Sequence, residues 1–252
     1  MTALSLVTVA ERPELTAEMV RLGASPWPEF LDHDPVVNDL WHLLYELAPD
    51  YQFALVDEQT TSLAAVGNCI PIRWDGNPQS LPEGGIDAVL HDGIACLRED
   101  ARPTAASALM IVVNPERRGS GLSGGAIRAM AEIVGRHGLA DLVAPVRPTD
   151  KHRYPLIPMA RYIRWRRGDG LPFDTWIRVH ERVGGEILGP ASAAMRVTGT
   201  VGEWERWTGM SLPESGAYVV PEALVPVEID RDRDVGEYVE PACWVRHRVQ
   251  AR

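Results

Sequence analysis

The sequence predicts a mixed α/β (α+β) fold in a single domain, and two observations carry this prediction. First, strand-like and helix-like periods follow one another in a mixed order: a strand hairpin, a buried strand, a helix, a strand, a helix and further strands. Second, the 252 residues are 45% hydrophobic and 24% charged, which is the composition of a globular chain with one sizeable core.

The first half of the chain is expected to hold helices and a strand hairpin. Residues 35–47 place Leu40, Leu43, Leu44 and Leu47 on one helical face. Two apolar runs separated by a short turn indicate the hairpin. The other elements expected here are a strand at 5–9, a helix at 13–22, hairpin strands at 52–56 and 62–72, and a helix at 86–98.

The second half begins with the clearest strand and helix. Residues 105–113 form an apolar run that ends in β-branched residues, which predicts a buried strand. Residues 122–137 have helical spacing, and Gly138 stands where the helix should stop. The remaining expected elements are a strand at 142–146, a short helix at 158–166, a helix at 174–183 with Asp174 as N-cap and Gly184 as stop, a short helix near 202–208 and a final hairpin across 231–236.

The charge is unevenly distributed. The formal net charge of −10 argues against a general nucleic-acid binder and against docking on an anionic membrane. Residues 1–59 carry a local charge of −9, whereas residues 147–182 carry +5. Most of these charges fit an ordinary solvated surface, but the pattern also fits an acidic side that receives a cationic acceptor and a basic side that receives an anion.

The three cysteines, Cys69, Cys96 and Cys243, lie far apart in the sequence. No C-x-x-C pair is present, so neither a disulfide framework nor a metal site is expected, and small buried side chains are the favoured interpretation. The first 15 residues lack the basic start of a signal peptide, and no apolar run approaches 18 residues. A cytoplasmic protein is therefore expected.

The most informative segment covers residues 113–123, where the buried strand leads through Gly119 and Gly121 into the long helix. Glycines let successive N–H groups converge on one point, and the helix start adds its own free N–H groups, so the segment suits a diphosphate. A Walker loop requires a lysine after the glycines, and none is present. Gly119, Gly121 and Gly124 match a dinucleotide fingerprint, but no acidic residue ends the next strand.

A third phosphate-binding pattern accounts for more of the segment. Val113, Pro115, Arg118 and Gly121 resemble the acetyl-CoA signature of the GNAT superfamily of acyl-CoA N-acyltransferases, with Ser123 where that family has Gly or Ala. The resemblance covers residues 4–219. It implies a mostly antiparallel sheet whose fourth and fifth strands splay apart, flanked by helices. A strand extension at the C-terminus lies outside the resemblance.

The resemblance implies where acetyl-CoA binds. Ile111, Val112 and Val113 are assigned to the pantetheine arm, which pairs with the strand as an added strand would. The pyrophosphate is assigned to Arg118, Gly119, Ser120, Gly121, Leu122, Ser123 and Gly124. A backbone N–H near Val113 would polarise the thioester carbonyl, and the amine would attack the thioester directly.

The residues that move protons are less well marked. The family's tyrosine, which protonates the leaving thiolate, aligns with His180, four residues before Gly184. His180 is therefore a candidate general acid, the alternative being a helix-surface histidine bonded to a neighbour. No acidic residue lies on the strand at 105–113, and Glu203 and Glu205 fit helix-surface charges better than a catalytic base.

One connection is unusually long for a compact domain, and two further segments exceed a minimal domain of this family. The 147–173 loop holds four aromatic residues and seven basic ones, so it is either a packed lid or a wall of the acceptor pocket with arginines near the CoA phosphates. Residues 73–98 are expected to be an insertion within the single domain 1–252. The C-terminal extension 220–252, with Tyr238 and Trp244, could cover a sheet edge or form a homodimer contact.

The function expected from the sequence is acyl-CoA-dependent N-acyl transfer, most simply of an acetyl group to the primary amine of a small molecule. The alternative is a GNAT-fold module that binds acyl-CoA without catalysis, as a sensor or scaffold. The missing strand acid and the missing tyrosine favour the alternative, whereas the glycine segment fits both.

Overall fold

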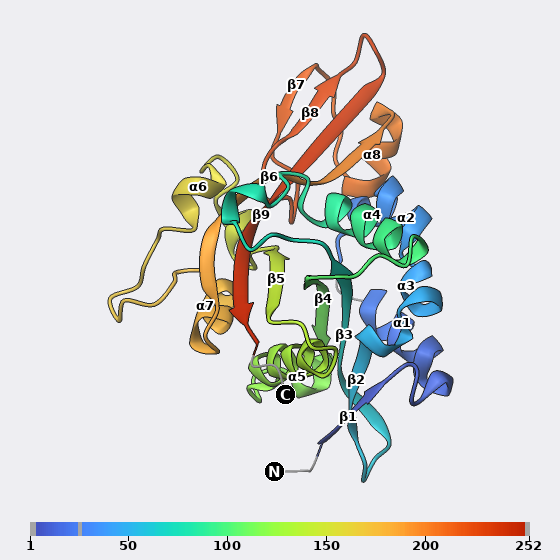
Figure 1. Ribbon diagram of the computed structural model, residues 1–252. Helices are drawn as coiled ribbons and strands as arrows, with labels where there is room; N and C mark the ends of the chain where they lie inside the picture. The colour runs from blue at the N-terminus through green and yellow to red at the C-terminus, as the bar shows by residue number, and fades with distance from the viewer. Residues whose placement is uncertain (1–3, 25–26, 250–252) are drawn as a thin grey trace.

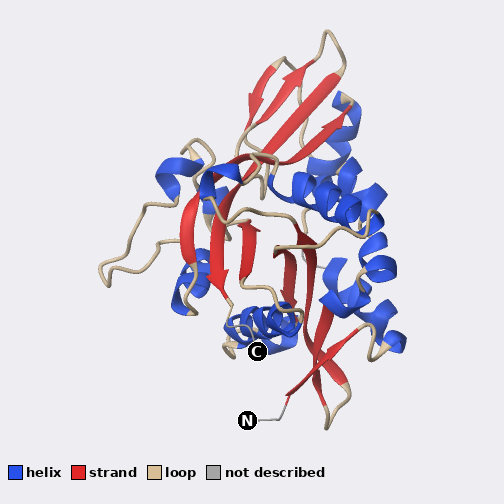
Figure 2. Ribbon diagram, viewed as in Figure 1, coloured by secondary structure: helices blue, strands red, loops and turns tan. Residues whose placement is uncertain are grey.

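The computed structural model describes residues 4–24 and 27–249 and shows one nine-stranded sheet covered by helices on both faces (Figures 1 and 2). The strand order is β1-β2-β3-β4-β5-β9-β8-β7, and β6 also pairs with β9. The strands are β1 (Leu4–Thr8), β2 (Gln52–Asp57), β3 (Ser62–Ile72), β4 (Ala105–Val113), β5 (Asp141–Val146), β6 (Glu186–Gly199), β7 (Gly216–Tyr218), β8 (Val227–Asp230) and β9 (Val235–Arg248). The helices are α1 (Thr16–Ala24), α2 (Pro35–Leu40), α3 (Leu43–Leu47), α4 (Gly85–Arg98), α5 (Leu122–Arg136), α6 (Met159–Tyr162), α7 (Thr175–Arg182) and α8 (Val201–Thr208).

The sheet is split between β4 and β5. These strands run parallel, whereas the other paired strands of the described chain are antiparallel, and their ladder holds only Ala106–Leu142 and Ser107–Val143. Just beyond this ladder, Leu109 is an extra residue on β4, because β3 faces Ala108 and Met110 but not the residue between them. Such a bulge bends and twists a strand. The mixed, mostly antiparallel sheet with splayed fourth and fifth strands is therefore confirmed.

Alternate residues of β2 separate the two helical layers. Phe53 and Leu55 pack with Met130 of α5, whereas Ala54 and Val56 pack with Met19 of α1. Because side chains alternate across a strand, α5 and α1 lie on opposite faces of the sheet. The four helices α1–α4 gather at the right in Figure 1, and α5 and α7 lie lower down and to the left.

The C-terminal extension lies inside the sheet. β9 pairs with β6 along one side and with β5 and β8, at different points, along the other, so it is an interior strand. Tyr238 is 0% exposed and Trp244 is 3% exposed, and both pack in hydrophobic clusters. The extension therefore covers the edge of β5, one of the two roles expected for it, while the burial of Tyr238 and Trp244 leaves these side chains unavailable to a second copy. A homodimer stays a prediction.

Two expected helices differ in extent. Residues 35–47 form α2 and α3 with a tighter turn between them, where Leu44 N–H bonds to Trp41 and Tyr45 N–H bonds to His42, each three residues back. The expected helix at 158–166 is shorter, because it ends at Tyr162. Within residues 4–24 and 27–249, no helix is both long enough and apolar enough to cross a membrane.

Candidate functional site

The end of β4 leads into a tightly fixed turn. The Asn114 side chain donates to Leu63 O on β3 at 3.0 Å and accepts from Glu116 N–H at 3.1 Å. Pro115 opens a short 3-10 turn, Pro115–Arg117, in which a proline costs nothing because the first N–H has no helical partner. This arrangement explains the proline of the sequence signature: it ends the strand and fixes the direction of the chain that follows.

The next residues form what we call the phosphate cradle, residues 118–124. Gly119 and Gly121 have φ angles of +81° and +78°, a region that glycine adopts without strain. Two hydrogen bonds hold the turn in place. Ser120 Oγ donates to Arg117 O at 2.5 Å, and the Arg117 guanidinium donates to Asp57 Oδ2 at 2.6 Å. The cradle is thus anchored through Arg117 to the end of β2.

The cradle leaves the start of α5 open. Gly121 is the N-cap residue, no side chain caps the helix, and its first turn contains no acidic residue. Arg118, Gly119, Ser120 and Gly121 are all exposed, and the Arg118 guanidinium has no ion-pair partner among the described residues. Free N–H groups, the positive end of a helix and an unpaired guanidinium together suit a phosphate group.

The backbone of β4 offers free hydrogen-bonding groups at the split. Asn114 N–H bonds to Ala64 O on β3, and Val113 stands opposite Ala65. Because an antiparallel ladder bonds alternate residues, Asn114 and Val112 turn their polar groups to β3, and Val113 and Ile111 turn theirs to the split. The ladder to β5 stops at Ser107, so no strand of the described residues pairs with these groups.

Helix α7 packs beside α5 and carries His180. The Cα of Gly124 lies so close to Val183, just after α7, that a Cβ there would be 3.1 Å from the valine side chain. His180 is 3% exposed, and its Nδ1 lies 2.9 Å from Nε2 of His247 on β9. Its Nε2 is buried without a hydrogen-bond partner in the described residues.

Burial changes the acid–base character of this histidine pair. Desolvation, followed by the neighbouring His247, lowers the pKa of His180 to about 3, and desolvation lowers the pKa of His247 to about 4. Both imidazoles are therefore neutral near pH 7. The expectation that His180 has a pKa near neutrality is wrong, because the partner and the burial come from a strand 67 positions away in the sequence.

At the start of α7, the free N–H groups of the first turn are hydrogen-bonded by the side chain of the N-cap residue, Asp174. The buried Asp174 carboxylate accepts from Trp176 N–H at 2.9 Å and from Ile177 N–H at 3.1 Å, as expected for the N-cap. It also accepts from Asp150 N–H and from the Tyr162 hydroxyl. Asp174 therefore joins the helix to the loop that precedes it.

The same loop contains the single lysine of the chain. Lys151 is fully buried, and its ammonium donates to Tyr154 O at 2.8 Å and to Leu224 O at 2.6 Å. Desolvation lowers the pKa of this ammonium to about 8. Lys151 thus links the 147–173 loop to the C-terminal extension through a hydrogen bond to Leu224.

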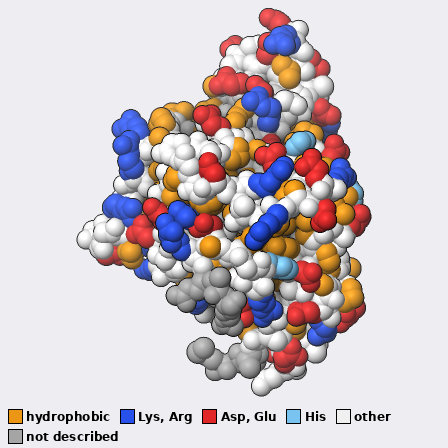
Figure 3. All heavy atoms as spheres, in the orientation of Figure 1, with side chains coloured by type: hydrophobic (Ala, Val, Ile, Leu, Met, Phe, Trp, Pro, Cys, Tyr) orange, Lys and Arg blue, Asp and Glu red, His pale blue; other side chains and the backbone are white. Residues whose placement is uncertain are grey.

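The aromatic residues of the 147–173 loop pack on one another. Tyr154, Tyr162, Trp165 and Phe173 form ring pairs with centroids 5.0–6.3 Å apart, mostly edge to face. Of the two interpretations left open by the sequence, this packing favours a packed lid for the aromatic residues. Arg147 is largely buried and pairs with Glu240, whereas the other arginines of the loop remain at its surface. Figure 3 shows basic side chains gathered on this side of the molecule.

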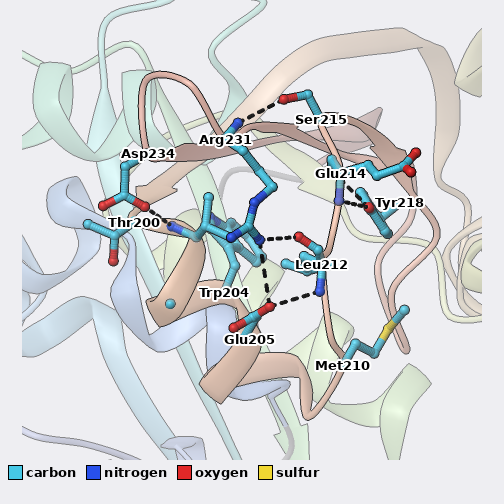
Figure 4. Close-up of polar contacts among 12 residues, drawn as sticks. Thr200, Trp204, Glu205, Met210, Leu212, Glu214, Ser215, Tyr218, Arg231 and Asp234 are labelled. Atoms are coloured by element: carbon cyan, nitrogen blue, oxygen red, sulfur yellow. Dashed lines mark hydrogen bonds and ion pairs between the residues drawn. The ribbon is translucent and has the colours of Figure 1, made fainter.

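Glu203 and Glu205 serve structural roles in α8. Glu203 forms a capping box with Thr200. Glu205 Oε1 accepts from Leu212 N–H at 2.9 Å and lies 4.0 Å from the Arg231 guanidinium (Figure 4). These contacts agree with the interpretation of both residues as helix-surface charges.

Two carboxyls on the helical face of α2 and α4 were not singled out by the sequence. Asp34 caps α2 and is 0% exposed, while Asp87 Oδ2 accepts from Arg196 N–H at 3.1 Å. Burial, with the charge of Asp34, raises the pKa of Asp87 to about 8, and burial also raises the pKa of Asp34. The Asp87 carboxyl therefore binds a proton more readily than an exposed aspartate does.

Comparisons with known proteins agree with this geometry. No protein-family model matches the chain. A curated relative, arginine N-acetyltransferase avaD from Aspergillus versicolor, is 31% identical over 274 aligned positions, which cover 97% of this chain and 94% of the relative.

Two solved structures share the fold across nearly the whole chain. The loading GNATL domain of CurA from Lyngbya majuscula is 19% identical, with a TM-score of 0.66 and coverage of 99% of this chain and 100% of that domain. The GphF GNAT-like decarboxylase in complex with isobutyryl-CoA is 18% identical, with a TM-score of 0.59 and coverage of 98% and 100%. At these identities the likeness concerns the fold alone.

Proposed function

The chain belongs to the GNAT superfamily of acyl-CoA N-acyltransferases, and from that premise we propose that it transfers an acetyl group from acetyl-CoA to a primary amine of a small cationic molecule. The observation that carries the proposal is the uncapped start of α5 directly after the split in the sheet. A donor with a diphosphate and an extended amide arm needs both features, and both lie within residues 111–124 of this chain.

The donor site we propose uses backbone groups more than side chains. Ile111, Val112 and Val113 line the pantetheine arm, and the free polar groups of Ile111 and Val113 pair with its amides as a neighbouring strand would. The phosphate cradle, from Arg118 through Gly119, Ser120, Gly121, Leu122 and Ser123 to Gly124, holds the diphosphate. Gly124 is buried against Val183, so in our assignment it lets α7 approach rather than donating a side chain.

The chemistry we propose is direct attack. The nitrogen of the neutral amine forms a bond to the thioester carbonyl carbon, the carbon–sulfur bond breaks, and the thiolate leaves with the electron pair. The proton that the nitrogen gives up as it becomes an amide passes to water. The Val113 N–H, which faces the split, donates to the carbonyl oxygen as its negative charge develops. Holding both reactants in one orientation supplies much of the rate, and no covalent enzyme intermediate forms.

His180 has a revised role in this proposal. A neutral imidazole buried against His247 cannot supply a proton as an imidazolium, so we assign His180 to the positioning of α7 and not to acid catalysis. The test is His180→Gln, for which we expect a pH profile of kcat parallel to that of the unchanged protein. Loss of one limb of that profile would restore His180 as the general acid.

The acceptor we propose is the amine of a basic amino acid. Two observations support it: the acidic balance of residues 1–59, and the relative whose name states that it acts on arginine. The test is release of free thiol from acetyl-CoA with arginine, lysine, agmatine and uncharged amines. Cationic amines should be preferred. Tight CoA binding without thiol release for any amine would overturn the proposal.

A further inference from the structure

A second basic feature lies near the phosphate cradle and is not used by the function proposed above. A cavity of about 400 Å³ is lined by Asp150, Arg153, Arg167, Phe173, Thr175 and Arg178. Three guanidiniums and one carboxylate leave its lining with a net positive charge, in a chain whose formal charge is −10. Such a concentration of arginines favours a phosphate or a carboxylate as the ligand.

The three arginines differ in how firmly they are held. Arg178 donates to Pro172 O at 2.9 Å and to Phe173 O at 2.8 Å, so its charge is fixed at the end of the loop. Arg167 pairs with the exposed Asp169 at 3.4 Å. Arg153 is exposed and has no ion-pair partner among the described residues. The Asp150 carboxylate is turned toward Thr175, from whose N–H and hydroxyl it accepts.

The cavity and the cradle lie on neighbouring parts of the fold. Parallel strands place their carboxyl ends at one edge of a sheet; the cradle follows β4, and the loop that lines the cavity follows β5. Helix α7 connects the two sites: its last turn contacts Gly124 of the cradle, and Thr175 and Arg178 at its other end line the cavity. Because α7 has eight residues and is about 12 Å long, the cradle and the cavity lie about one short helix apart.

We infer that this cavity, the arginine pocket, binds the 3′-phosphoadenosine end of coenzyme A. The inference rests on the proposed function, because it extends the same donor outward from its diphosphate. The Phe173 ring offers an apolar surface for adenine, and the guanidiniums of Arg153, Arg167 and Arg178 face the ribose 3′-phosphate. Its volume falls in the range of small-molecule sites.

If the arginine pocket binds the ribose 3′-phosphate, removing that phosphate should lower the affinity of the ligand for the protein. Dephospho-CoA differs from CoA only in that phosphate, so it isolates the contribution of the arginine pocket. The protein should bind CoA about tenfold more tightly than dephospho-CoA, which corresponds to about 1.4 kcal/mol. The preference should shrink as salt concentration rises, because the pocket is open to solvent.

Isothermal titration of both ligands against the full chain tests this inference. Arg153→Gln and Arg167→Gln should bring the ratio of the two affinities close to one while dephospho-CoA binding stays unchanged. The matched control is Arg164→Gln, an exposed arginine of the same loop outside the pocket lining, which should keep the tenfold ratio. Adenosine 3′,5′-bisphosphate should compete with CoA in the unchanged protein and not in Arg153→Gln.

The outcomes separate this inference from the proposed function. Equal affinity of the unchanged protein for CoA and dephospho-CoA would overturn the arginine pocket and leave the phosphate cradle intact. Equal weakening by Arg153→Gln and Arg164→Gln would overturn it as well, since that result indicates general charge attraction. Failure of both ligands to bind would overturn the proposed function and this inference together.

Discussion

The two helices beside the split in the sheet begin in opposite ways. At α5 the N-cap residue is Gly121, which has no side chain to offer, and the helix start is exposed. At α7 the N-cap residue is Asp174, whose buried carboxylate accepts from two N–H groups of the first turn. Both helix starts carry the same partial positive charge. They differ in the acceptor for their free first-turn N–H groups: Asp174 supplies one at α7, and no described side chain supplies one at α5.

This difference explains why the start of α5, and not that of α7, is suited to bind an anion. At α7 the protein supplies the negative charge itself, and Asp174 also fixes the preceding loop. At α5 no described side chain caps the helix, at a cost to stability of roughly a few tenths of a kcal/mol relative to a good cap, because glycine is itself tolerated at the N-cap. That cost is offset when a phosphate takes the place of the missing carboxylate.

The largest effect is expected from filling the space in front of α5. Gly121→Val places a branched side chain at φ +78°, where no described protein atom lies within 4 Å, so the new atoms occupy the cradle itself. CoA affinity measured by titration should fall at least about 100-fold. Gly138→Val is the matched control, because Gly138 has φ +73° at the other end of α5 and is equally open. Equal CoA affinity in the two variants would contradict our placement of the cradle.

The next effect tests the closed helix start. Asp174→Ala leaves the first-turn N–H groups of α7, Asp150 N–H and the Tyr162 hydroxyl without their acceptor. The free energy of unfolding should fall by about 3 kcal/mol, which combines a lost cap with buried unsatisfied donors. Urea denaturation measures it. Asp169→Ala, an exposed change in the same loop, should cost less than about 0.5 kcal/mol. Similar losses in both variants would show that Asp174 is not the organising residue.

A pH-dependent effect is expected at the other end of α7. His180 and His247 have pKa values of about 3 and about 4 in the folded protein, below the ordinary value of 6.5. A base whose pKa is lowered by folding contributes stability above pH 6.5 and loses it as the pH falls toward the folded value. Between pH 7 and pH 5, the free energy of unfolding should fall by about 2 kcal/mol for each of the two histidines.

Urea midpoints at pH 7 and pH 5 measure this loss. In His247→Gln the difference between the two midpoints should shrink, because one buried titrating group is gone. His91→Gln is the control, since His91 is exposed on α4 and should leave the difference unchanged. A midpoint difference that is the same in all three proteins would disprove the role of the buried pair.

The smallest effect separates charge from shape at the open helix start. Gly121→Asp and Gly121→Asn introduce side chains of nearly equal size, and both residues tolerate positive φ better than others do. The aspartate should weaken CoA binding about tenfold more than the asparagine, because it supplies α5 with the charge that Asp174 supplies to α7. The gap should narrow at high salt. Equal binding by the two variants would mean that the helix start does not contact a phosphate.

Local features of the sequence predicted much of the donor side of the fold. The apolar run of β4, the glycine turn and the helical period of α5 are encoded by neighbouring residues, and the structure places all three as expected. Asp174 and Gly184 likewise mark the two ends of α7 through local capping. The assignment of these residues to acetyl-CoA remains a prediction.

The features that the sequence did not predict depend on distant contacts. The family resemblance implies the split in the sheet but not the extra residue at Leu109 beside it, because a bulge is a backbone event that a hydrophobic pattern does not reveal. The neutral state of His180 depends on His247, and the interior place of β9 depends on pairing with β5. The last two are set by residues more than 60 positions apart, beyond the reach of a periodicity argument.

The burial of Lys151 affects whether the protein can itself be acylated by the acyl-CoA that it binds. Acyl thioesters acylate exposed amines without any enzyme, and a protein that binds them repeatedly is exposed to this side reaction. The chain has one lysine, and its ammonium is enclosed and bonded to two carbonyls. The described surface therefore offers no lysine to damage, and arginine supplies its positive charge while remaining inert to thioesters.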